Sequence, residues 1–130
     1  MDKKMIKDIS DKAVIYKHSG YNCAQAVVKA LSEAKGIDND MLLQATSGFA
    51  VGMGTMEATC GALIGANMMA GIEMAGKGTI MKSKELFSEF TKNSGGSICK
   101  DLKGIDTGVV KCECDDCIRN AICAYGEKIG

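Results

Sequence analysis

The sequence predicts an all-α protein: one compact domain over residues 1–130, a bundle of about five to seven helices with a glycine-rich loop. Apolar residues recur at three- and four-residue spacing over most of the chain, which is the periodicity of amphipathic helices. The alternation of apolar and polar residues that predicts strands is hard to find. A length of 130 residues suits one domain with its own core, and no linker, repeat or low-complexity run divides the chain.

Three helices are expected in the first part of the chain, over residues 3–17, 23–34 and 40–46. The first has an apolar stripe and ends before Gly20, because glycine interrupts a helix. The second follows Asn22, a good N-cap residue, with Gln25 three positions later, which approximates a capping box. Gly36 ends this second helix.

A glycine-rich segment follows, with Gly48, Gly52 and Gly54 within seven residues. Glycine accepts positive φ and close backbone approach, so the segment can wrap tightly around a bound group. A tight connection between two helices is an equally good interpretation. The segment lacks the Lys-Ser/Thr pair of a phosphate-binding loop, which gives nucleotide binding little support.

Four more helices are expected over residues 57–74, 80–93, 97–102 and 114–128. In the first of these, Gly61 and Gly65 are four residues apart and form a flat stripe that a neighbouring helix can approach closely. We expect this stripe to serve the core, although it could also support a homodimer. Asn67 and Glu73 interrupt the apolar character of the segment, so it is expected to be a buried helix and not a membrane span.

Cysteine placement is the strongest indication of function. Four of the seven cysteines, Cys23, Cys60, Cys99 and Cys114, stand where a helix is expected to begin. The free amide groups and the aligned peptide dipoles of a helix start favour a thiolate over a thiol, and thiolates attack disulfides and bind metals. A single cysteine is more often a small buried apolar residue. Repetition at four helix starts favours a common thiolate site.

The last helix adds a local cluster. Cys112, Cys114 and Cys117 provide up to three soft ligands in a short span, which suits zinc, copper(I) or an iron–sulfur cluster. Structural zinc sites usually use two cysteine pairs, and only one pair is present here. At about 100° per residue, Cys123 falls on the opposite face from Cys114 and is left out of the site.

Bulk composition excludes several classes of protein. Sixteen basic residues balance sixteen acidic ones, so the chain has no basic surface of the kind that binds nucleic acid. The amino-terminal residues contain no apolar run of a secretory signal, so we expect a cytoplasmic protein with reduced thiols. His18 is the single histidine, is expected to be an exposed residue at a helix end, and has no partners for a Ser–His–Asp triad.

These cysteines occur in a pattern that resembles the family of putative redox-active proteins named for a C…GCAxxG…C…C motif. The matching segments are residues 20–27, residues 48–54, Cys60-Gly61-Ala62-Leu63-Ile64-Gly65, residues 99–104 and the helix that begins at Cys114. The resemblance implies four key cysteines at Cys23, Cys60, Cys99 and Cys114, with Cys112 and Cys117 as additions. Similar domains accompany an iron–sulfur centre in some cytochrome-type proteins, which favours a cluster by analogy.

The leading hypothesis is a small electron-transfer protein whose cysteines converge on one iron–sulfur cluster and which works with a redox partner protein. The expected metal ligands are Cys23, Cys60, Cys99, Cys114 and Cys117, and the residues whose backbone approaches the cluster are Gly48, Gly52, Gly54 and Gly61. One alternative is a thiol–disulfide or sulfur-transfer enzyme that uses Cys60 as nucleophile with a resolving cysteine. Another is an interaction module stabilised by zinc.

Overall fold

The computed structural model describes residues 1–130 and is all-α, as predicted. It contains seven α-helices and one short wide turn of helix, η1. The helices are α1 (Lys3–Lys17), α2 (Cys23–Lys35), α3 (Asp40–Thr46), η1 (Gly52–Met56), α4 (Gly61–Glu73), α5 (Thr79–Ser94), α6 (Cys99–Lys103) and α7 (Cys114–Lys128).

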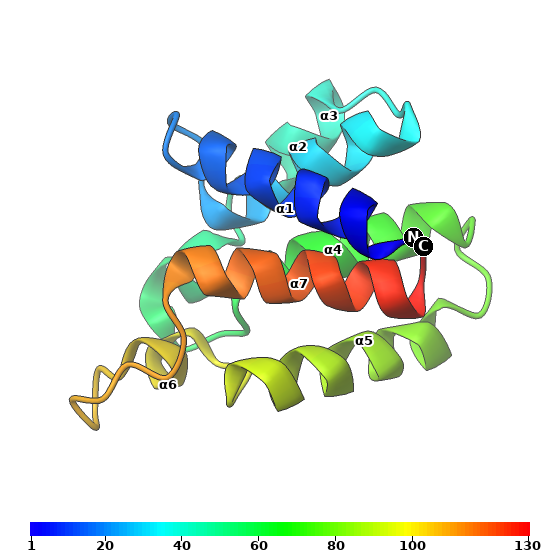
Figure 1. The fold of residues 1–130 in the computed structure, drawn as a ribbon. Coiled ribbons are helices and arrows are strands. Elements are labelled where there is room, and N and C mark those ends of the chain that lie inside the picture. Colours follow the sequence, from blue (N-terminus) through cyan, green and yellow to red (C-terminus); the bar gives the residue numbers. More distant parts are fainter.

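Helix α7 lies in the middle of the bundle, with α1 and α5 on opposite sides of it and α4 behind it (Figure 1). Its buried side chains include Ile118, Ile122 and Tyr125, which are fully excluded from solvent. Burial of apolar side chains of this size stabilises the fold by about 1.5–3 kcal/mol each. None of the helices combines the length and the apolar character needed to cross a membrane.

The predicted bounds of α1, α3 and α7 are confirmed, and those of α2, α5 and α6 differ by one or two residues. The start of the fourth helix was predicted too early, at residue 57. Residues 57–60 lie outside the helix instead, because Thr59 pairs with Ile98 in an isolated antiparallel bridge. Cys60, with φ −51° and ψ 129°, is therefore the N-cap of α4.

The glycine stripe of α4 faces α2. A Cβ at Gly65 would lie 2.7 Å from the backbone oxygen of Ala24, and a Cβ at Gly61 would lie 2.8 Å from the oxygen of Phe49. Both glycines are buried. The stripe therefore serves packing inside this chain, as expected, and it is not exposed to a second copy.

The start of α2 is fixed by the capping box that the sequence predicted. The Asn22 side chain accepts a hydrogen bond from the backbone N–H of Gln25 at 2.9 Å, and the Gln25 side chain accepts one from the N–H of Asn22 at 3.2 Å. This cap holds Cys23 in the first position of the helix.

Replacement of Asn22 by Ala should lower the free energy of unfolding by about 0.5–2 kcal/mol, because the N–H of Gln25 loses its acceptor. Urea denaturation monitored by circular dichroism measures this change. Asn39→Ala is the matched control, because Asn39 is the N-cap of α3 but its side chain makes no capping hydrogen bond. An equal loss in both variants would contradict the capping argument.

Candidate functional site

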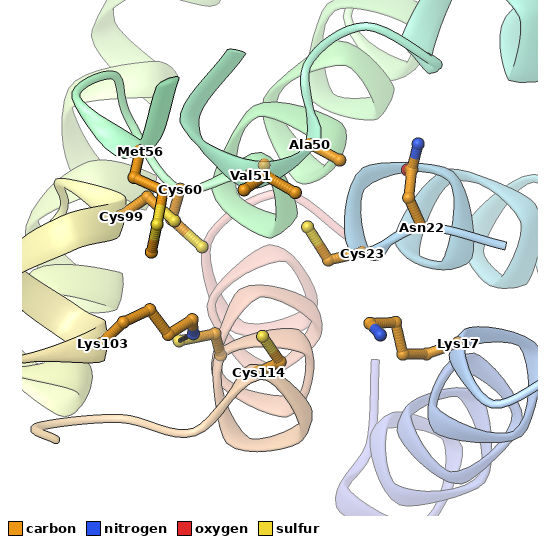
Figure 2. Close-up of a pocket in the computed structure, with 12 residues that line it drawn as sticks. Lys17, Asn22, Cys23, Ala50, Val51, Met56, Cys60, Cys99, Lys103 and Cys114 are labelled. Carbon is orange, nitrogen blue, oxygen red and sulfur yellow. Dashed lines mark hydrogen bonds between the residues drawn. The ribbon is translucent and has the colours of Figure 1, made fainter. Parts of the chain in front are cut away.

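The starts of four helices surround one cavity of about 280 Å³ (Figure 2). Five of the twelve residues that line it are cysteines: Cys23, Cys60, Cys99, Cys114 and Cys117. They come from the first residue of α2, the N-cap of α4, the first residue of α6 and the first turn of α7. Cysteines up to 94 positions apart in sequence therefore meet around a common space.

The backbone explains why Cys60 and Cys99 lie together. The segments that precede α4 and α6 run antiparallel, with Thr59 opposite Ile98. The N–H of Cys60 donates to the oxygen of Ser97 at 2.7 Å, and the N–H of Cys99 donates to the oxygen of Ala58 at 3.0 Å. Two hydrogen bonds between segments thus hold two helix starts side by side.

The end of α6 also positions the start of α7. The N–H groups of Lys111 and Cys112 both donate to the oxygen of Leu102, at 3.0 and 3.2 Å. The Lys103 side chain donates to the oxygen of Cys112 at 3.3 Å. These contacts place Cys114 and Cys117 on the wall of the cavity that faces α6.

Two of the seven cysteines lie outside the cavity. The sulfur of Cys112 accepts a hydrogen bond from Asn120 at 3.7 Å, and the thiol of Cys123 is 3.5 Å from the carboxylate of Glu127. The prediction left Cys123 out of the site, and the structure places it away from the other five.

The four glycines expected at the site differ in how close they lie to the cavity. Gly61 lines the cavity, and a Cβ there would lie 2.9 Å from the sulfur of Cys23. Gly52 is buried behind Cys99, where a Cβ would lie 2.9 Å from the Cβ of that residue. Gly48 and Gly54 have no atoms within 4 Å of such a position, and neither lines the cavity.

The segment from Val51 to Met56 contributes its two end residues to the apolar lining of the cavity and has an unusual backbone. Val51, Met53 and Met56 have φ values of 54°, 57° and 64°, in the left-handed region that costs side-chain-bearing residues energy. Val51 is β-branched, which makes its conformation the least expected of the three. The sequence predicted positive φ for glycines here, but not for these three residues. Val51 and Met56 line the cysteine cavity, whereas the side chain of Met53 is exposed.

Cys60 has the electrostatic environment of a reactive thiol. A hydrogen bond with the Cys117 thiol lowers the pKa of Cys60 most, burial opposes this, and the N–H groups of Ala62 and Leu63 lower it further, to about 6. The same contact raises the pKa of Cys117, since Cys117 is the partner that keeps its proton. The Cys117 thiol also lies 3.7 Å from the backbone oxygen of Cys112, to which it can donate.

Lys103 supplies a positive charge to this group. Its ammonium lies 3.8 Å from the sulfur of Cys117. Burial lowers the pKa of Lys103, but the nearby sulfurs of Cys117, Cys114 and Cys60 raise it by more, so the side chain is held in its charged form.

The pKa values of two further thiols of the cavity, Cys23 and Cys99, move in the opposite direction from that of Cys60. Burial raises the pKa of Cys23 most, and the charge of Cys60 raises it further. The pKa of Cys99 is likewise raised, first by burial and then by the charge of Cys60. The environment of the cavity therefore favours the thiolate form at Cys60 and the protonated form at Cys23 and Cys99.

The two lysines of the cavity were not predicted from the sequence. Lys103 lies four residues after Cys99 in α6, a spacing that places both on one side of a helix, so this pattern could have revealed it. Lys17 is at the end of α1, remote in sequence from every cysteine except Cys23, and only the tertiary fold brings it to the cavity.

The donor set of the cavity fits some metal centres better than others. Cysteine sulfurs are the ligands that iron–sulfur clusters use, and five of them surround one space. No three His, Cys, Asp or Glu side chains are grouped as a single metal ion would require.

Comparison with known proteins gives a family but no individual relative. No curated protein matches the chain, and no solved structure does. A family model described as "Putative redox-active protein (C_GCAxxG_C_C)" matches residues 21–127, which include every cysteine of the chain. The chain therefore belongs to this family of redox-active proteins, as its cysteine pattern indicated.

Proposed function

We propose that the protein is a dithiol–disulfide redox protein in which Cys60 is the nucleophile and Cys117 is the resolving cysteine. The observation that carries this proposal is that Cys60, the N-cap of α4, and Cys117, in the first turn of α7, line the same cavity beside the Lys103 ammonium. The N-terminal amides of α4 and the Lys103 ammonium support the thiolate of Cys60, and Cys117 keeps its proton until it is needed.

The chemistry follows from these roles. The Cys60 thiolate attacks a disulfide and forms a mixed disulfide, with release of one thiolate. Cys117 then attacks the sulfur of Cys60, its proton passes to the second leaving thiolate, and a Cys60–Cys117 disulfide forms. The protein loses two electrons, the attacked disulfide gains them, and a dithiol reductant reverses the reaction.

Mild oxidation of reduced, metal-free protein tests this proposal. We expect one intramolecular disulfide, and peptide mapping by mass spectrometry should assign it to Cys60 and Cys117. The Cys117→Ser variant should stop at a stable mixed disulfide on Cys60, whereas Cys123→Ser should behave as the parent protein, because Cys123 lies outside the cavity. A disulfide that joins other cysteines would contradict the assignment.

A second candidate rests on a different observation: a dithiol needs two cysteines, and five line the cavity. Four thiolates would hold an iron–sulfur cluster, drawn from the pool of Cys23, Cys60, Cys99, Cys114 and Cys117. Such a cluster supplies one-electron transfer to a redox partner protein. The chain contributes apolar walls that exclude water, the backbone of Gly61, and the Lys103 ammonium as a counter-charge to the thiolates.

Iron and sulfide analysis of anaerobically purified protein separates the two candidates. About two or four iron atoms per chain, lost in Cys23→Ser, would establish the cluster, because Cys23 has no role in the dithiol mechanism. Iron-free protein that still forms the Cys60–Cys117 disulfide would establish the dithiol.

A further inference from the structure

The charges around the cysteine cavity have one sign. Lys17 and Lys103 are the only residues other than cysteine in its lining that can carry a charge, and the lining contains no carboxylate and no histidine. Asp115, in the first turn of α7, is hydrogen-bonded to His18 at 2.9 Å and does not line the cavity. A guest in this space therefore meets positive charge and sulfur.

Neither lysine forms an ion pair with a carboxylate of the protein. The ion pairs of the structure involve other basic residues, so both ammonium groups lack a carboxylate partner. Lys103 donates only to a backbone oxygen and a sulfur. Asn22, the remaining polar residue of the lining, is already occupied, because its side chain caps α2 and donates to the oxygen of Ser47 at 3.0 Å.

The two lysines reach the cavity from opposite sides. Figure 2 shows Lys17 extending from the end of α1 and Lys103 from α6, with Cys114 between them. A cavity of about 280 Å³ is slightly smaller than the range for small-molecule sites, roughly 300–1,000 Å³. The space thus fits a compact molecule with negative groups at its ends and a reactive centre between them.

We propose that the substrates of this site are low-molecular-weight disulfides with anionic groups, which Lys17 and Lys103 hold while Cys60 attacks the disulfide bond. This inference rests on the dithiol function proposed above. One anionic end pairs with Lys17 and the other with Lys103, so the disulfide sulfurs lie against the cysteines. The first attack joins Cys60 to one half of the substrate and releases the other half as a thiolate. Cys117 displaces the second half, so one disulfide is reduced to two thiols and one protein disulfide is formed.

Three aliphatic disulfides of similar size test the selection by charge: dithiodiglycolate, which is dianionic, hydroxyethyl disulfide, which is neutral, and cystamine, which is dicationic. Each is mixed with reduced, metal-free protein, and the rate of Cys60–Cys117 disulfide formation is followed by mass spectrometry. We expect the dianion to react fastest and the dication slowest. The differences should shrink as salt is raised, because ions screen the exposed part of the attraction.

Lys17 gives the sharper test, because it lies on the far side of the cavity from Lys103 and does not contact Cys117 (Figure 2). Lys17→Gln should lower the ratio of the dithiodiglycolate rate to the hydroxyethyl disulfide rate about fivefold, as loss of one charge contact predicts. Lys4→Gln removes an equal charge from an exposed position of the same helix and should leave the ratio unchanged.

Each result has a definite meaning. Equal rates for the three disulfides, or a ratio that Lys17→Gln does not change, would show that the site does not select anions, while the dithiol function would stand. Failure of all three reagents to form the Cys60–Cys117 disulfide would show that both the function and its substrate class are wrong.

Discussion

Iodoacetamide should alkylate Cys60 with a pH midpoint near 6, about three pH units below the ordinary value of 9.0. At pH 6 about half of Cys60 would be thiolate, against roughly one part in a thousand for an ordinary cysteine, a ratio of about 500. The lower basicity of this thiolate reduces its intrinsic nucleophilicity by roughly twentyfold. A net advantage of about twentyfold at pH 6 remains.

The measurement is alkylation of reduced, metal-free protein over a range of pH, with each site quantified by peptide mass spectrometry. Cys23 and Cys99 serve as internal references, because burial raises their pKa values and their alkylation should still be increasing above pH 9. Cys117→Ala should move the Cys60 midpoint upward, since it removes the main group that stabilises the thiolate. A Cys60 midpoint near 9 in the unmodified chain would contradict the assigned nucleophile.

The lowered pKa of Cys60 also makes the free energy of unfolding depend on pH. Because the pKa of Cys60 is lower in the folded state, folding favours its thiolate form. This contribution is fully present above the unfolded value of about 9 and is lost as pH falls through about 6. Cys117, Cys23 and Cys99 act in the opposite sense above their ordinary values, because their pKa values are raised.

Most of the helices could be predicted because the residues that determine each helix lie within it or next to it in sequence. The apolar stripe of α1, the capping box at Asn22 and the acidic first turn of α7 all lie within a few residues of the feature they determine. The non-helical segment just before α4 could not be predicted in this way. It depends on pairing between Thr59 and Ile98, which are 39 positions apart, and local periodicity does not report such contacts.

At the candidate site, too, features set by local sequence could be predicted and features set by contacts between remote segments could not. The placement of cysteines at helix starts could be predicted from the sequence, because capping residues mark where a helix begins and glycines mark where the preceding one ends. The sequence could not show that Cys117 is the partner of Cys60, because this depends on how α7 packs against α4. The position of Lys17 at the cavity likewise depends on packing between α1 and segments remote in sequence.

Packing between α2 and α4 provides the second large effect. Gly65→Ala should lower the free energy of unfolding by about 1–3 kcal/mol, the usual cost of overpacking a core. The new Cβ would lie 2.7 Å from the oxygen of Ala24 and 3.4 Å from side-chain carbons of Val27 and Val28. The closest obstacle is backbone, so relief requires α2 to move away from α4. That movement would also displace Cys23, the first residue of α2, from the cavity.

Gly71→Ala is the matched control within the same helix. A Cβ at Gly71 would meet only a methyl carbon of Thr79 at 4.0 Å, so no group has to move. Alanine in a helix interior is favoured over glycine by roughly 0.5–1 kcal/mol, so this variant should be more stable than the parent. Urea denaturation of the two variants should therefore show changes of opposite sign. A stabilising effect of Gly65→Ala would mean that α2 and α4 are farther apart in solution than in this structure, and that the cysteine cavity is correspondingly wider.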